Sequence, residues 1–307
     1  MISTLLLYKI LQLALVMLLG FMLVKLRLIK TEDSTALSKI SLYLLMPAAI
    51  LNAFDVERTQ EITKGLILAF AVAIVVHILL LIFDRIYLKL FKGTSTERAS
   101  IIYSNAANLI IPIVSYVLGE EWVIYSCAFM SVQLIFLWTH GIQIFSSSEK
   151  ISFRKILLNV NLIAIVIGGL LMFFGIRLPK FAKEVTSSLG SMIGTVGMLI
   201  AGILAANVDF KKMLKNKRLY LVLFMRMLVC PFLVLLLIKI IRANIDIVNA
   251  DKILLISLLA AITPTAATIM QFAQIYKKDA DFATAVNIVT TLVCIFSMPL
   301  FVLLYQI

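Results

Sequence analysis

The stretch 103–115 combines side chains that bind polar ligands with a sequence apolar enough to lie in a membrane. It holds Asn105, Asn108 and Pro112. Because proline has no N–H and clashes with the carbonyl four residues back, the Asn108 carbonyl loses its helical partner. Such a carbonyl is costly in lipid unless protein, water or a ligand binds it. Both amides offer uncharged donors and acceptors, so we expect a helix break at Pro112 and contacts from Asn105 and Asn108 to a polar ligand. Hydrogen bonds between helices are the alternative.

A second interrupted stretch, 260–274, carries Pro264 at a distance of 152 residues (264 − 112) from the first proline, about half of the 307-residue chain. Two interrupted helices in matching places of two halves are typical of a transporter's binding site. Thr265 and Thr268 are candidate ligand contacts, although threonine hydroxyls in apolar helices often bond back to the preceding turn. The N–H groups at the ends of broken helices favour an anion.

Arg226 lies well inside an apolar stretch, where a cation is costly and is often functional. It is a candidate counter-charge for a carboxylate substrate, and the alternative is a side chain that extends to the membrane surface. Asp84 is followed by Arg85, which predicts an ion pair at the membrane surface, with proton coupling as the alternative.

Four further polar residues lie in apolar stretches. His77 and His140 are expected to be neutral and bonded to carbonyl groups, although histidine also titrates near neutral pH. Gln133 and Asn287 either line the pathway or join helices, and the pattern does not separate these interpretations.

The sequence contains no signature of catalysis. It has no HExxH, GxSxG or GxxxxGK[ST] motif, which argues against a metalloprotease, a serine hydrolase and an ATP-driven pump. The three cysteines are single and lie in apolar stretches, so we expect buried side chains and no metal site or cofactor. The chain is therefore not expected to be an enzyme.

Composition indicates a multi-pass membrane protein, since 62% of the residues are hydrophobic and the mean hydropathy is +1.08. The net charge of +12 comes from basic residues in short loops, which favours membrane topology over nucleic-acid binding. Apolar runs long enough to cross the bilayer predict ten helices, numbered here 1–10 in chain order, at 5–24, 34–54, 65–90, 99–118, 122–145, 156–174, 185–206, 218–241, 252–274 and 280–304.

The distribution of Lys and Arg predicts the orientation. Loops on one side hold eighteen of these residues and loops on the other hold nine, so the richer side is expected to be cytoplasmic and both termini outside, in the plasma (inner) membrane. Five helices per half make the repeats 1–145 and 156–307 inverted, joined by a cytoplasmic linker at 146–155. Broken helices 4 and 9 would then cross near the midplane.

Over its whole length the sequence resembles the auxin efflux carrier family, in its prokaryotic malate- and malonate-permease-like branch. The opening GFMLVKLRLIKTEDSTALSKISLYLLMPAAIL and the segment TPTAATIMQFAQIYKKDADFATAVNIVTTLVCIFSMP carry the resemblance. The first family crossover reads Asn-x-Gly-x-x-Gly-x-Pro, and here Ala107 and Ile110 replace both glycines. Thr268 stands where many relatives have Asn.

The resemblance implies a homodimeric all-α transporter with a scaffold of helices 1, 2, 6 and 7. Helices 3–5 and 8–10 would form a moving domain that works by an elevator-like mechanism. We therefore expect a secondary transporter of a small organic (di)carboxylate anion, held where helices 4 and 9 cross. The alternatives are a sodium-coupled symporter of the bile-acid type and a membrane sensor that binds its ligand without net transport.

Overall fold

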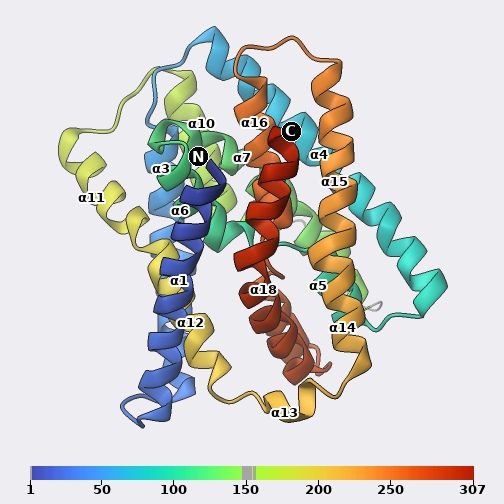
Figure 1. The fold of residues 1–307 in the computed structure, drawn as a ribbon. Helices are drawn as coiled ribbons and strands as arrows, with labels where there is room; N and C mark the ends of the chain where they lie inside the picture. Colours follow the sequence, from blue (N-terminus) through green and yellow to red (C-terminus); the bar gives the residue numbers. More distant parts are fainter. Residues whose placement is uncertain (1, 147–153, 155–156) are drawn as a thin grey trace.

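The computed structural model describes residues 2–146, 154 and 157–307 as an all-helical bundle (Figure 1). Most of the expected linker at 146–155 lies outside these residues. The first half contains α1 (Ile2–Lys25), η1 (Thr31–Asp33), α2 (Ser34–Ile40), η2 (Ser41–Leu45), α3 (Met46–Phe54), α4 (Gln60–Phe91), α5 (Ser95–Ile102), α6 (Ala106–Val117), η3 (Glu120–Trp122), α7 (Val123–Phe136), η4 (Leu137–Gly141) and α8 (Ile142–Phe145). The second half contains α10 (Val160–Phe173), α11 (Lys180–Ser191), α12 (Ile193–Ala205), α13 (Phe210–Met213), α14 (Lys217–Phe224), η5 (Met225–Val229), α15 (Cys230–Ala243), α16 (Ala250–Ile262), α17 (Ala267–Ile275) and α18 (Ala280–Gln306).

Seven helical segments of the described chain are long and apolar enough to cross a membrane, and each coincides with one of the ten expected spans. The other three expected spans differ from a single long helix. The stretch 99–118 is divided into α5 and α6, and 252–274 is divided into α16 and α17. The stretch 156–174 contains the shorter apolar helix α10. The two stretches that we expected to be interrupted are therefore both interrupted.

In the part of the chain that the structure describes, three spans contain a π-helical turn. Two of these turns, η2 and η5, directly precede helices with a proline in the first turn, Pro47 in α3 and Pro231 in α15. A proline removes one i→i−4 bond, and a π turn lets the neighbouring carbonyls find partners one residue further along. In η5 this widened turn carries Arg226 toward the interior of the bundle, where its side chain is fully buried.

Glycines permit a close contact between the two halves of the chain, where α1 packs against α12. A Cβ on Gly202 would lie 1.9 Å from the Met17 carbonyl oxygen, so no other residue fits there without a backbone shift. Further along α12, Gly194 faces Pro112 of α6 and Gly197 faces Asn108. Gly194 and Gly202 therefore let α12 pack closely against its neighbours.

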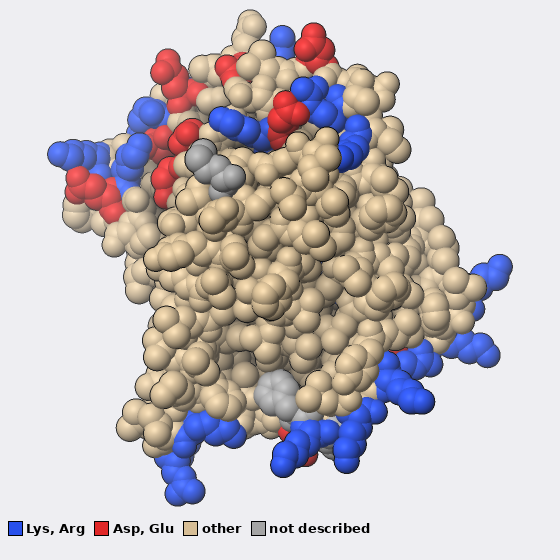
Figure 2. All heavy atoms as spheres, viewed as in Figure 1, with Lys and Arg blue, Asp and Glu red and all other residues tan. Residues whose placement is uncertain are grey.

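On the face shown in Figure 2, the exposed charged side chains gather at the two ends of the bundle, and the band between them is free of charge. Both termini lie toward the end where basic and acidic side chains are mixed. The opposite end, which carries α13 and the start of α14, shows mainly Lys and Arg and is called the basic face below.

Candidate functional site

The two helix breaks lie against each other. Ser104 and Thr265 form an isolated antiparallel bridge. Asn105 N–H donates to the Pro264 carbonyl (2.7 Å) and Ala266 N–H donates to the Tyr103 carbonyl (2.9 Å). Each break therefore satisfies backbone groups that the other helix lost, which is how non-helical backbone is tolerated at membrane depth. We call this pair of segments, 103–105 and 263–266, the crossover.

Side chains from two further helices hold the crossover in place. Gln133 of α7 donates from Nε2 to the Ser104 carbonyl (2.8 Å), and the Ser104 hydroxyl donates back to Gln133 Oε1. Asn287 of α18 donates to the Thr265 carbonyl (2.6 Å), and Thr265 N–H donates to the Thr290 hydroxyl (3.2 Å). Gln133 and Asn287 thus take equivalent positions on the two breaks and act as joints in this conformation.

Arg226 binds the carbonyl ends of both interrupted helices. Its Nη1 donates to the Ile101 carbonyl at the end of α5 (3.1 Å). Its Nη2 donates to the carbonyls of Ala261 (2.8 Å) and Thr263 at the end of α16. The guanidinium neither extends to the surface nor contacts solvent, so the interpretation as a surface-seeking side chain is wrong. It places a positive charge at two helix ends that carry partial negative charge.

The amino ends of α6 and α17 also begin at the crossover. Neither helix has an acidic residue in its first turn. Within the described residues, the N–H groups of Ala106, Ala267 and Thr268 have no hydrogen-bond partner. Since Arg226 offsets the negative helix ends, the two positive ends remain without compensation. This arrangement attracts an anion.

The structure places the predicted amides at the start of α6. Asn105 is the residue before the helix, and its Oδ1 accepts a bond from Asn108 Nδ2 (3.2 Å). Asn108 is half-buried and faces Gly197 of α12. The predicted break at Pro112 is wrong, because the chain breaks at 103–105 and Pro112 lies inside α6. A proline in a helix interior need only bend it, whereas the crossover bonds stabilise a full break.

In the second break the proline lies in the non-helical segment, as predicted. Pro264 leaves the Ala260 carbonyl without its helical partner, and the Thr263 hydroxyl donates to it (3.0 Å). Thr265 is fully buried and its hydroxyl donates to the Ser100 carbonyl (2.9 Å). Thr268 is half-buried in the first turn of α17. Of the two threonines, Thr268 is therefore the more accessible to a ligand in this conformation.

A polar cluster extends from the crossover toward the basic face. Arg98 donates two bonds to the Asp84 carboxylate, one of them from Nε at 2.9 Å. His140 Nε2 lies 3.4 Å from Asp84, and its Nδ1 lies 2.9 Å from the Tyr103 hydroxyl. The expected pairing of Asp84 with Arg85 is wrong, since Arg85 is one residue further around the helix and points away from the bundle.

The two histidines differ. His77 bonds to the Ala73 carbonyl (2.7 Å) and stacks on Phe136, which confirms a carbonyl-bonded histidine. His140 instead contacts the hydroxyl of Tyr103 and the carboxylate of Asp84, so the same expectation for His140 is wrong.

Sequence reasoning missed Ser104 and Arg98. Ser104 lies at the centre of the first break. The sequence predicted that break at Pro112, eight residues further along, and so gave no reason to expect Ser104 in it. The bond between Arg98 and Asp84 joins α5 to α4, and the sequence offered no signal for it, because the nearer residue Arg85 competes for the same carboxylate.

The sequence model of a family described as membrane transport protein matches residues 5–302. No curated protein matches the chain.

Proposed function

The chain belongs to the membrane transport protein family, which is the auxin efflux carrier family, and from this premise we propose that it is a secondary transporter of small organic anions. The anion would bind at the crossover, against the first turns of α6 and α17. The proposed contacts are the amides of Asn105 and Asn108 and the hydroxyls of Thr265 and Thr268. A transporter, not an enzyme, is the known kind of protein in this family.

The observation that carries this proposal is the charge arrangement at the crossover. Two helix carboxyl ends bind Arg226, two helix amino ends have free N–H groups, and no Asp or Glu lies in either crossover segment. A carboxylate would satisfy those N–H groups, and the buried guanidinium would add a longer-range attraction in a medium of low dielectric constant.

We further propose ten membrane spans, arranged as two inverted repeats of five, with the basic face in the cytoplasm and both termini outside the plasma (inner) membrane. The joints made by Gln133 and Asn287 support this proposal, because they hold the two breaks from corresponding fifth and tenth helices. The proposal also includes a homodimer in which helices 1, 2, 6 and 7 form a scaffold. The other helices form a moving domain that works by an elevator-like motion. The contact of Gly194 with Pro112 supports the motion, since a glycine offers little obstruction to sliding.

The test is uptake of radiolabelled malate and malonate into proteoliposomes of the purified protein. We expect Asn108→Ala to reduce uptake at least about tenfold, as for the loss of a hydrogen bond to a charged group. Asn244→Ala is the matched control, because Asn244 is an exposed asparagine whose side chain bonds only to the Ile240 carbonyl. Absence of uptake for every anion, with binding retained, would favour a sensor. Uptake that requires a sodium gradient would favour the bile-acid-type symporter.

A further inference from the structure

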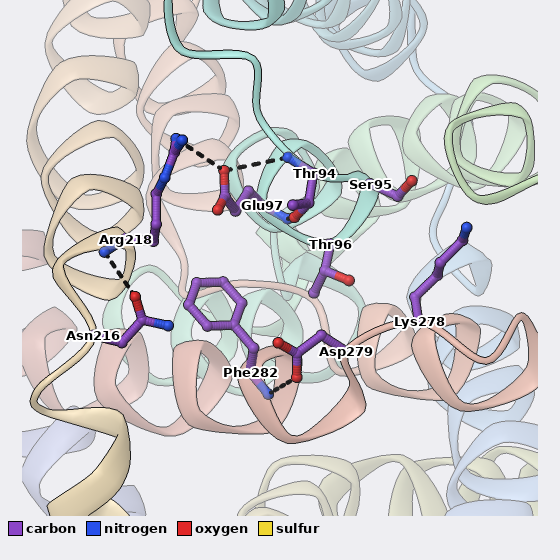
Figure 3. Close-up of a pocket in the computed structure, with 9 residues that line it drawn as sticks. All are labelled: Thr94, Ser95, Thr96, Glu97, Asn216, Arg218, Lys278, Asp279 and Phe282. Atoms are coloured by element: carbon purple, nitrogen blue, oxygen red, sulfur yellow. Dashed lines mark hydrogen bonds and ion pairs between the residues drawn. The ribbon is translucent and has the colours of Figure 1, made fainter.

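A cavity of about 390 Å³ opens at the basic face, away from the crossover. Figure 3 shows that it lies between the first turns of α5, α14 and α18. Its lining comprises Thr94, Ser95, Thr96, Glu97, Asn216, Arg218, Lys278, Asp279 and Phe282. We propose that this cavity, here called the basal pocket, binds the phosphate group of a lipid headgroup or of free phosphate.

Three helix amino ends meet at the basal pocket. Thr94, Asn216 and Asp279 are the residues that precede α5, α14 and α18, and each accepts one N–H bond from its helix. Each helix has further N–H groups in its first turn that these caps do not satisfy. Converging amino ends supply both hydrogen-bond donors and a positive potential, which suit a tetrahedral oxyanion.

A buried hydroxyl without a partner points to a ligand independently of the helix ends. Thr96 is only 1% exposed, and its hydroxyl has no hydrogen-bond partner among the described residues. In Figure 3 this hydroxyl is directed into the pocket, toward the side that carries Lys278. Because the hydroxyl lines the open pocket and is not enclosed by protein, it is a donor for a ligand that the pocket binds.

The pocket is lined by two basic and two acidic side chains, and both acidic side chains already accept hydrogen bonds. Glu97 accepts bonds from Tyr87 and from Thr94 N–H, and Arg218 lies 3.6 Å from it, so its charge is already compensated. Asp279 accepts the Phe282 N–H at the positive end of α18. Lys278 has no ion-pair partner in the described part of the chain, and it stands opposite Arg218 across the pocket (Figure 3).

Helix α14 begins with Lys217 and Arg218 and has no acidic residue in its first turn. Cations at a helix amino end are unfavourable by themselves, and a bound anion would reverse that effect. The three helices also connect the basal pocket to the crossover, because α5 ends there, α14 leads into the turn of Arg226, and α18 carries Asn287. Occupancy would therefore fix the positions of three elements that hold the crossover.

The experiment measures thermal unfolding of the full chain in dodecyl maltoside micelles, which contain no phosphate. In one arm we titrate inorganic phosphate, and in a second arm we add phosphatidylglycerol to the micelles without inorganic phosphate. A rise in Tm in the first arm identifies free phosphate, and a rise only in the second identifies a lipid headgroup.

Thr96→Val removes the hydroxyl without changing its size, and Lys278→Gln removes the charge at an exposed position. We expect each substitution to weaken the response about tenfold, as for the loss of one hydrogen bond to a charged group. Lys277→Gln is the control, since Lys277 is the preceding exposed lysine and does not line the pocket. Lack of a response to both phosphate and phosphatidylglycerol, or an equal response in Lys278→Gln and Lys277→Gln, would overturn the proposal. None of these measurements depends on transport, so the basal pocket and the crossover site can fail separately.

Discussion

Replacing Arg226 by methionine tests the central argument about the crossover. Methionine keeps most of the side-chain volume and removes both the charge and the donors. The carbonyls of Ile101, Ala261 and Thr263 then lose the guanidinium that binds them. Each of these three carbonyls already lacks a hydrogen bond from the N–H four residues further along the chain. Arg226 itself is 0% exposed, so water does not replace the lost donors.

The size of the effect follows from those three acceptors. A buried polar group without a partner costs about 1–3 kcal/mol, so three cost about 3–9 kcal/mol. The variant recovers the several kcal/mol spent on burying a guanidinium, which leaves a net destabilisation of about 2–4 kcal/mol. For a chain of 307 residues we expect Tm to fall by about 3–6 °C.

The assay is thermal unfolding of the purified protein in detergent, together with proteoliposome uptake. Arg226→Lys separates charge from geometry, because an ammonium keeps the positive charge but cannot reach carbonyls on both helix ends at once. We expect Arg226→Lys to keep more uptake than Arg226→Met. Lys239→Met is the control, since Lys239 lies on the same span with an exposed side chain.

One result would refute this reasoning. If Arg226→Met unfolded within about 1 °C of the unmodified protein and transported at its rate, the guanidinium would neither stabilise the helix ends nor provide a field for the anion. The proposed origin of anion preference would then have to be abandoned, although the paired breaks would remain.

Three further predictions concern the bundle. Gly202→Ala should destabilise the protein by about 1–3 kcal/mol in a thermal unfolding assay, because the new Cβ would meet the Met17 carbonyl. Gly169→Ala is the control, since no atom lies within 4 Å of its Cβ, and it should have no such effect. Asn287→Leu should cost about 1–3 kcal/mol by leaving the Thr265 carbonyl without its donor, and it should lower uptake in parallel; full activity would contradict the role of Asn287 as a joint. Burial would raise the pKa of Asp55, but its bonds to Lys183 and to the Leu178 N–H hold that pKa below its ordinary value. The ionised Asp55 carboxylate therefore stabilises the folded state above the unfolded-state pKa of about 3.9, and this stabilisation is lost as the pH falls through the lower folded-state pKa. We expect Tm of the unmodified protein to drop more steeply below about pH 4 than Tm of Asp55→Asn.

The sequence determined which parts of this chain are helical and which two of the helices are interrupted. Apolar runs, their lengths and the basic loops are local properties, and they act on each segment before any packing occurs. The break at Pro264 could be predicted because the partner of the freed Ala260 carbonyl is close in sequence. The Thr263 hydroxyl, three residues further along, donates to it.

Only the tertiary structure decided where the first break lies. The energy of a break depends on what its carbonyls and N–H groups meet, and those partners come from residues far along the chain, Pro264 and Gln133. The same holds for Arg226, whose acceptors are 35 or more residues away in sequence. A single residue's type shows that it needs a partner, but the partner itself is chosen by packing, because hydrogen bonds act over about 3 Å whatever the separation along the chain.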